Sequence, residues 1–169
     1  MLRRLVRNLH VGQKIPDQKL ILVQGTPGKY AVERNISSAT YFANKKVVLV
    51  GFPGAFTPTC QSKHLPEYIQ HQTVFGTKGF TVLGLAVNDP FVMKEFAEEL
   101  KGSIGYIADA DGSFTKALEA GADFSEAALG YRTRRFSVVV ENGTVTQVND
   151  EQGGKLTEVS RAETVLKTI

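Results

Sequence analysis

The sequence has few of the residues that would mark a disulfide-linked, metal-binding or membrane protein. Its 169 residues include one cysteine and no tryptophan. One cysteine excludes an intrachain disulfide and a zinc cluster built from cysteines, and it is typical of a reducing compartment. The most apolar run, residues 47–52, is interrupted by Gly51 and followed by Pro53, and it falls far short of the ~20 residues that span a bilayer. We therefore expect a soluble protein with no membrane partner and no metal or other cofactor.

Acidic residues are missing from the first eight positions, which carry Arg3, Arg4 and Arg7. These three arginines account for the whole formal net charge of +3, so the rest of the chain is neutral. A basic surface of the kind that binds nucleic acid is therefore not indicated, and no nucleic-acid partner is expected.

The first nine residues have the pattern of a short amphipathic helix. Apolar residues, the last of them Leu9, recur at helical spacing with the arginines between them. An arginine-rich, acid-free segment of this kind is typical of a mitochondrial transit peptide, and a frayed basic terminus is the alternative. We expect residues 1–9 to be a targeting segment and residues 10–169 to form a single domain, in a mitochondrial or alternatively a cytoplasmic protein.

The periodicity of apolar residues indicates an α/β fold. Residues 46–52 and 80–87 lack polar alternation, as expected of strands covered on both faces. Helical segments follow both runs, which favours a parallel core with right-handed crossovers. The other predicted elements are a helix from 57 to about 75 with a kink at Pro66, a helix begun by Asp89 and Pro90, a strand at 104–108, a helix after the turn 109–112, hairpins at 20–36 and 136–148, and a last helix from about 158 to 169.

Cys60 follows the first buried strand, at the end of the string Pro-Gly-Ala-Phe-Thr-Pro-Thr-Cys. Thr57 can cap a helix with its hydroxyl, and Pro58 suits the first helical position because it lacks an N–H that would be unpaired there. Cys60 then falls in the first turn, where free backbone N–H groups and the helix dipole favour the thiolate, the reactive form of cysteine. A lone cysteine is otherwise a small buried apolar residue, and the capped turn after a strand favours the reactive interpretation.

The residues around Cys60 resemble the active-site signature of the peroxiredoxins. Pro53, Thr57 and Cys60 match the pattern Pro-x-x-x-Thr-x-x-Cys, and the longer string, followed by His64-Leu65-Pro66, resembles the type-5 branch of that family. The resemblance runs from about residue 11 to the C-terminus. It implies a thioredoxin-like fold, in which helices flank a central mixed sheet that an N-terminal β-hairpin extends, and it implies a homodimer.

By this resemblance the protein is a thiol-dependent peroxidase that reduces hydrogen peroxide and alkyl hydroperoxides in antioxidant defence. Cys60 attacks the peroxide and becomes a sulfenic acid, while backbone N–H groups of the same turn are directed at the sulfur. Thr57 places its hydroxyl beside the sulfur, and Pro53 shields the pocket from water. Arg135, directly before the second predicted hairpin, corresponds by resemblance to the family's invariant arginine, and a guanidinium suits the role because it stays charged and has several donors.

Three further residues near these positions in the sequence, a histidine and two arginines, are considered for the site. His64 is four residues after Cys60 and so lies on the same helical face. We expect it to support the site rather than to act as the base of a cysteine protease, for which no orienting partner is evident. Arg132 and Arg134 are expected to be solvated or to contribute to dimer contacts.

Two-cysteine members of the type-5 branch have a second, resolving cysteine. By the resemblance, Glu158 occupies the corresponding position in this sequence. The sulfenic acid must then be resolved by an external thiol, either glutathione with glutaredoxin or a thioredoxin-type protein. A second hypothesis is that Cys60 is a redox sensor that passes its oxidation to a partner protein, since the same thiolate serves both roles.

Overall fold

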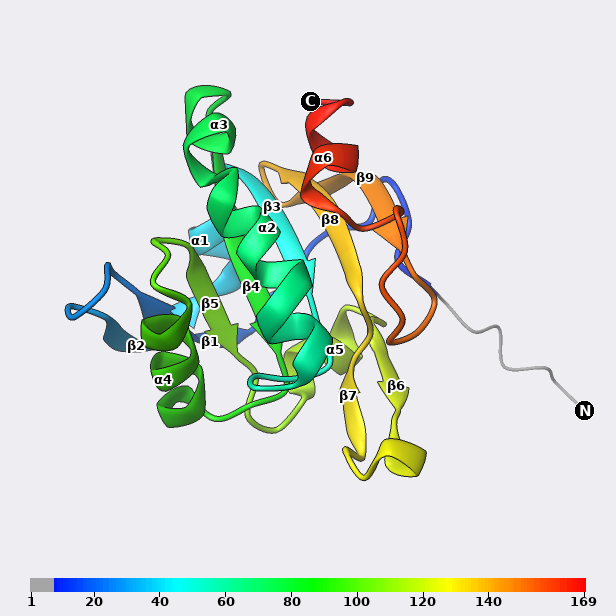
Figure 1. Cartoon of the computed structure of the whole chain (residues 1–169). Helices are drawn as coiled ribbons and strands as arrows, with labels where there is room; N and C mark the ends of the chain where they lie inside the picture. Colours follow the sequence, from blue (N-terminus) through cyan, green and yellow to red (C-terminus); the bar gives the residue numbers. More distant parts are fainter. Residues whose placement is uncertain (1–7) are drawn as a thin grey trace, which may run out of the picture.

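The computed structural model describes residues 8–169, and its centre is a seven-stranded sheet (Figure 1). The strand order is β2-β1-β5-β4-β3-β8-β9, and the sheet is mixed, as the sequence predicted. Its strands are β1 (Lys19–Gln24), β2 (Ala31–Ser37), β3 (Lys46–Gly51), β4 (Phe80–Ala86), β5 (Gly105–Ala108), β8 (Phe136–Glu141) and β9 (Thr144–Asp150). A small second sheet pairs β6 (Gly121–Asp123) with β7 (Tyr131–Thr133).

Helices cover both faces of the central sheet. They are α1 (Ser38–Phe42), the π-helical segment η1 (Cys60–His64), α2 (Leu65–Gln70), α3 (Gln72–Thr77), α4 (Pro90–Leu100), α5 (Ser113–Ala117) and α6 (Ala162–Leu166). The short 3-10 helix η2 (Ser125–Ala127) has no buried residue and connects β6 to β7. One core contains side chains of α2, α3, α4 and α6, among them Tyr68 and Phe96. The other contains side chains of α1 and α5, among them Phe42 and Phe114. In Figure 1, α2 and α4 lie in front of the sheet.

Strand β3 is buried on both faces. Val48 and Val50 belong to the core under α2 and α4, whereas Val47 and Leu49 belong to the opposite core. Burying each such side chain stabilises the fold by about 1.5–3 kcal/mol relative to leaving it exposed. β3 pairs in parallel with β4 and antiparallel with β8. The buried strand predicted at residues 46–52 is therefore confirmed, and the loop that leaves it begins at the centre of the sheet.

Most of the predicted elements are present in the structure. β1 and β2 form the N-terminal hairpin, and β8 and β9 form the hairpin near the C-terminus. β3, β4 and β5 are parallel. Asp89 caps α4, because its Oδ1 atom accepts hydrogen bonds from the N–H groups of Phe91 and Val92 at 2.9 and 3.0 Å.

The helix predicted from 57 to about 75 is interrupted. Residues 58–59 are α-helical, η1 is π-helical, and α2 and α3 are separated by a turn at His71. In η1 the N–H of Leu65 donates to the carbonyl of Cys60, five residues earlier. Pro66 has no N–H to extend an α-helical ladder to Ser62, so the expected kink takes the form of this widened turn.

Two further differences concern the second half of the chain. The last helix, α6, is shorter than the predicted 158–169, because residues 157–160 form a loop tied by hydrogen bonds to Glu151. The β6–β7 hairpin was not predicted, since strands of three residues are too short to show a periodic pattern.

The predicted targeting segment, residues 1–9, lies mostly outside the described residues, which begin at Asn8. Residues 8–10 are not helical, and Leu9 is buried in the core on the α1 and α5 face. Between residues 8 and 169, none of the helices has the length and apolar character needed to cross a membrane.

Candidate active site

The loop between β3 and Cys60 is held in a fixed shape by hydrogen bonds. The N–H of Ala55 donates to Asn88 Oδ1 at 2.9 Å, which ties this loop to the segment that follows β4. Pro53 and Gly54 are buried, and Phe56 has a φ of +60°, a conformation that costs energy for a bulky residue. The loop therefore has little freedom where it leads into the helix that carries Cys60.

Thr57 lies at the helix start, where its carbonyl accepts from the Gln61 N–H at 3.0 Å, but its hydroxyl does not cap the helix as the sequence predicted. Its hydroxyl donates to the carbonyl of Gly54 at 2.7 Å. That bond uses the only proton of the hydroxyl and leaves its lone pairs free to accept. Thr57 can therefore accept a hydrogen bond from a bound molecule, but in this geometry it does not donate to Cys60.

Cys60 is fully buried at the first position of η1. Within residues 8–169, the hydrogen bond that reaches its Sγ atom comes from Arg135 Nη2, at 3.2 Å. The expected backbone donors of residues 57–60 do not make such a bond. The charge next to the sulfur is thus supplied by a side chain from the other half of the sequence.

Arg135 is 2% exposed, and its guanidinium has three protein partners. Besides Cys60, Nη1 donates to His64 Nδ1 at 3.0 Å and Nε donates to the Gly154 carbonyl at 2.8 Å. In the described part of the chain no carboxylate forms an ion pair with Arg135. A buried cation requires a compensating anion, so the thiolate form of Cys60 is the one that this arginine stabilises.

His64 is fully buried and connects Arg135 to the C-terminal segment. Because Arg135 can only donate, His64 Nδ1 is the acceptor and its Nε2 carries the proton. Nε2 lies 3.1 Å from the Ser160 carbonyl, to which it donates. Burial, with the nearby charge of Arg135, lowers the pKa of His64 from 6.5 to about 3. The imidazole is therefore neutral at physiological pH and holds the guanidinium in place without competing with its charge.

Arg132 and Arg134 are not the solvated residues that the sequence prediction gave as one alternative. Arg134 is buried, forms an ion pair with Asp150 at 2.8 Å, and donates to the carbonyls of Glu119 and Gly121. Arg132 is half-buried and donates to the carbonyl of Val87 at 3.0 Å. Both arginines fasten the β6–β7 hairpin and its neighbours to the domain, and neither is a freely solvated residue.

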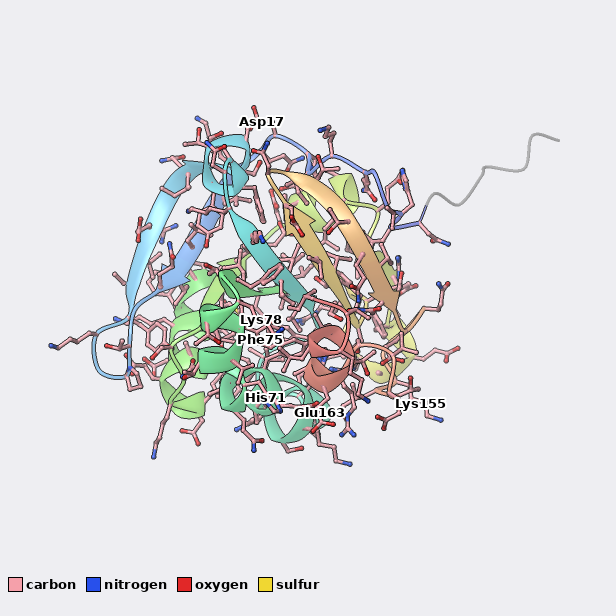
Figure 2. All side chains as sticks on the ribbon, turned by 90° about the horizontal axis from the view of Figure 1, so that it is seen from above. Asp17, His71, Phe75, Lys78, Lys155 and Glu163 are labelled. Carbon is pink, nitrogen blue, oxygen red and sulfur yellow. The ribbon has the colours of Figure 1, made fainter. Side chains whose placement is uncertain are left out.

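A surface cavity of about 270 Å³ lies beside the start of the Cys60 helix. It is lined by Thr59, Lys63, Lys155, Leu156, Thr157, Glu158 and Arg161. In Figure 2 the labelled Lys155 lies at the edge of the molecule, near α6 (red). Glu158, which the family resemblance aligns with a resolving cysteine, thus lines the same cavity as Thr59, the residue directly before Cys60.

The site has the groups for nucleophilic sulfur chemistry. Among residues 8–169, no group of three or more His, Cys, Asp or Glu side chains is placed to hold a metal ion. A buried cysteine sulfur beside a guanidinium, with a hydroxyl acceptor one turn earlier, suits attack on a small electrophile that carries an O–H group. Of the five predicted site residues, Cys60, Arg135 and His64 are joined by hydrogen bonds. Pro53 and Thr57 lie on the loop that leads from β3 to Cys60.

Comparison with known proteins gives consistent matches over nearly the whole chain. The Redoxin family model matches residues 10–166. Peroxiredoxin-2C of Oryza sativa is 41% identical over 162 residues, which cover 94% of this chain and 97% of that protein. Peroxiredoxin-2F, mitochondrial, of Arabidopsis thaliana is 42% identical over 131 residues, 76% of this chain and 65% of that one.

Solved structures agree with these sequence matches. The crystal structure of reduced Prx3 from Vibrio vulnificus in complex with H2O2 has a TM-score of 0.80 and 37% identity, covering 96% of this chain and 100% of that one. The Plasmodium falciparum antioxidant protein, a 1-Cys peroxiredoxin, has a TM-score of 0.82 and 27% identity, covering 92% and 95%.

Proposed function

The chain belongs to the redoxin family as a peroxiredoxin of the one-cysteine kind, with the thioredoxin-like fold, and we propose that Cys60 is the thiolate with which it reduces hydroperoxides. The protein is a thiol-dependent peroxidase of antioxidant defence. The observation that carries the assignment of Cys60 is the 3.2 Å hydrogen bond from Arg135 Nη2 to Sγ in a buried site.

In the first step the Cys60 thiolate attacks one oxygen of the hydroperoxide. A sulfur–oxygen bond forms, the O–O bond breaks, and the second oxygen leaves with the electron pair and takes a proton to become water or an alcohol. Sulfur is oxidised to a sulfenic acid and the peroxide is reduced. Arg135 offsets the negative charge that moves from sulfur to the leaving oxygen, because a guanidinium keeps its charge throughout.

Thr57 and Pro53 shape the place where the peroxide binds. The Thr57 hydroxyl already donates to Gly54, so its lone pair accepts the O–H of the peroxide and orients it. Pro53 is buried at the start of the loop and offers no N–H, so it closes the pocket with an apolar wall. His64 acts on the reaction only through Arg135.

In the second half of the cycle an external thiol resolves the sulfenic acid, because the sequence has no second cysteine. The thiol forms a mixed disulfide with Cys60 and releases water, and a second thiol then releases the Cys60 thiolate and a disulfide. Glutathione with glutaredoxin, or a thioredoxin-type protein, supplies these thiols. The cavity beside Thr59, with Lys63 and Lys155 in its lining, supports approach of the reductant from that side.

A homodimer is part of the same proposal. Phe91 is 72% exposed and Phe56 is 47% exposed, and Phe56 packs edge-on against Phe96 with the ring centroids 5.4 Å apart. Aromatic side chains are enriched at protein–protein interfaces, so exposed residues of this kind support an association surface. Sedimentation of the purified protein and of Phe91→Asp tests this, and a monomer at every concentration of the unchanged protein would overturn it.

A mitochondrial location is proposed, with the cytoplasm as the alternative. The arginine-rich first nine residues support it, and so does the likeness to a relative that carries the word mitochondrial in its name. Import of a reporter protein fused to residues 1–9 into isolated mitochondria would support this location, and a reporter left outside would contradict it.

Steady-state peroxide consumption with glutathione plus glutaredoxin, and separately with thioredoxin, tests the function directly. The unchanged protein should turn over many times with at least one reductant, and Cys60→Ser should be inactive while remaining folded. Substantial activity in Cys60→Ser would overturn the assignment. A protein that is oxidised once and then stalls with every reductant would instead be the sensor of the second hypothesis.

A further inference from the structure

The Glu151 side chain, at the end of β9, collects four hydrogen bonds from one short loop. Its Oε1 atom accepts from the Thr157 N–H at 3.1 Å, the Ser160 N–H at 3.0 Å and the Ser160 hydroxyl at 2.9 Å. Its Oε2 atom accepts from the Thr157 hydroxyl at 2.6 Å. A half-buried carboxylate with this many donors fixes the loop between residues 157 and 160 to the end of the sheet.

Ser160 passes this restraint on through its main chain. Its carbonyl accepts hydrogen bonds from His64 Nε2 at 3.1 Å and from the Tyr68 hydroxyl at 2.7 Å, both from buried side chains. The position of this carbonyl therefore sets where the His64 ring lies. Because His64 Nδ1 accepts from Arg135 and Arg135 donates to Cys60, a continuous series of hydrogen bonds leads from Glu151 to the reactive sulfur.

The main chain of Glu151 closes this series into a ring. The N–H of Glu151 donates to the Arg135 carbonyl at 3.0 Å, and the N–H of Arg135 donates to the Gly153 carbonyl at 2.7 Å. Arg135 is therefore held by its backbone from β9 and by its side chain from His64, and Glu151 contributes to both. A ring of this kind restrains the guanidinium more tightly than either set of contacts alone.

We propose that Glu151 is a positioning residue of the peroxidase reaction, which sets the place of the Arg135 guanidinium through Ser160 and His64. The proposal rests on the function proposed for Cys60 and Arg135. Glu151 touches neither the sulfur nor the peroxide, and it moves no proton or electron. Its effect arises because displacing a catalytic group by about 1 Å can cost about 10²-fold in rate.

The hydrogen bonds to Oε1 indicate whether the reaction depends on the position of the Glu151 oxygen or on its negative charge. Three of the four hydrogen bonds end on that single oxygen. A glutamine keeps an oxygen in the Oε1 position and loses the charge and the Oε2 acceptor of the Thr157 hydroxyl, whereas an alanine loses every acceptor. We therefore expect that geometry, rather than the negative charge, is what the reaction needs from this residue.

The test is the rate at which one equivalent of hydrogen peroxide oxidises Cys60 in the absence of reductant, followed by rapid mixing. Glu151→Ala should slow this step about tenfold or more, and Glu151→Gln should recover most of the rate. Glu98→Ala serves as the matched control, because Glu98 also holds a loop N–H, that of Gly28 at 2.6 Å, on another part of the domain. That control should keep the unchanged rate.

A double mutant separates a role through Arg135 from a general loss of structure. In the Arg135→Ala background, Glu151→Ala should have no further effect on the oxidation rate, since the group that it positions is absent. If the two substitutions lowered the oxidation rate independently, so that their effects multiplied in the double mutant, the proposal would be overturned. A Glu151→Ala protein that reacts at the unchanged rate would also overturn it. A Glu151→Gln protein as slow as Glu151→Ala would overturn the geometric role.

If Glu151→Ala does not fold, Glu151→Asp is measured instead. The aspartate keeps the charge, but its side chain is one methylene shorter, so the carboxylate lies farther from the donors of residues 157–160. A clear rate loss in the folded aspartate variant supports the proposal, and an unchanged rate overturns it. Failure here is distinct from failure of the proposed function, because the unchanged protein and Cys60→Ser decide the latter without any change at Glu151.

Discussion

Arg135 Nη2 lies 3.2 Å from Cys60 Sγ, although 75 residues separate them in the sequence. The sheet register produces this contact. Gly51, the last residue of β3, pairs with Phe136, the first residue of β8. Arg135 therefore stands directly before β8 at the place where the chain leaves β3 towards Cys60. The cation beside Cys60 is positioned by two adjacent antiparallel strands, which are among the most deeply buried in the fold.

Replacement of Arg135 should remove the charge beside the sulfur. We expect Arg135→Ala to lower the rate of Cys60 oxidation by about 10² to 10³, the usual cost of one preorganised donor. Arg134→Ala is the control, since Arg134 is paired with Asp150 and does not touch the sulfur. It should lower the unfolding midpoint but keep a far higher rate than Arg135→Ala. The reverse order of the two rates would contradict the assignment.

The Thr57 hydroxyl should matter as an acceptor. Thr57→Val removes both the lone pairs and the bond to the Gly54 carbonyl, and we expect a rate loss of about 10². Thr57→Ser keeps the hydroxyl and should stay within about tenfold of the unchanged protein. Single-turnover kinetics at several peroxide concentrations measure both, and an active valine variant would show that the hydroxyl is not used.

His64 should make the stability of the protein depend on pH. The folded protein keeps His64 neutral down to a pKa of about 3, whereas the unfolded chain binds the proton near 6.5. Between these values the unfolded state binds more protons, so stability is lost as the pH falls below about 6.5. From pH 7 to pH 5 this contribution amounts to about 2 kcal/mol.

Urea unfolding at the two pH values measures this effect. His64→Gln has no ionisable group at the position and should lose correspondingly less stability on acidification than the unchanged protein. Equal losses in the two proteins would show that His64 is protonated at a similar pH in the folded and unfolded states.

The oxidised protein should carry a sulfenic acid at Cys60 and no disulfide that links two chains. One equivalent of peroxide should give a species that a dimedone-type probe labels at Cys60, and a small thiol should convert it to a mixed disulfide of matching mass. Excess peroxide without thiol should carry Cys60 to sulfinic and sulfonic acids and abolish activity. Rapid formation of a Cys60–Cys60 dimer on non-reducing gels, faster than probe labelling, would contradict a buried sulfur.

Local patterns in the sequence were sufficient for much of the fold and for the place of the site. The valine run of β3 and the Asp89–Pro90 helix start were predicted because burial on both faces and helix capping act over a few residues. Arg135 was placed from its position before an apolar run, together with the family resemblance.

The rest depends on contacts that no local pattern records. The bond from the Thr57 hydroxyl to Gly54 follows from the strained turn at Phe56, and the burial of Arg134 follows from its pairing with Asp150 across the sheet. Glu151 has no motif around it, because its partners lie in an irregular loop. The sequence offers only a weak signal here, a glutamate three residues after the predicted strand that is followed by Thr157 and Ser160.

The hydrogen-bonding capacity of Arg135 has a consequence for the binding of peroxide. A guanidinium carries five N–H groups, and the contacts described here occupy one each on Nε, Nη1 and Nη2. The two N–H groups that remain belong to Nη1 and Nη2, the two nitrogens that face the helix of Cys60. An incoming peroxide can therefore be bound by this arginine without releasing any protein partner. The cation does not have to reorganise between the empty and the loaded site, and a lysine, with its single nitrogen, could not serve His64, Gly154, Cys60 and substrate together.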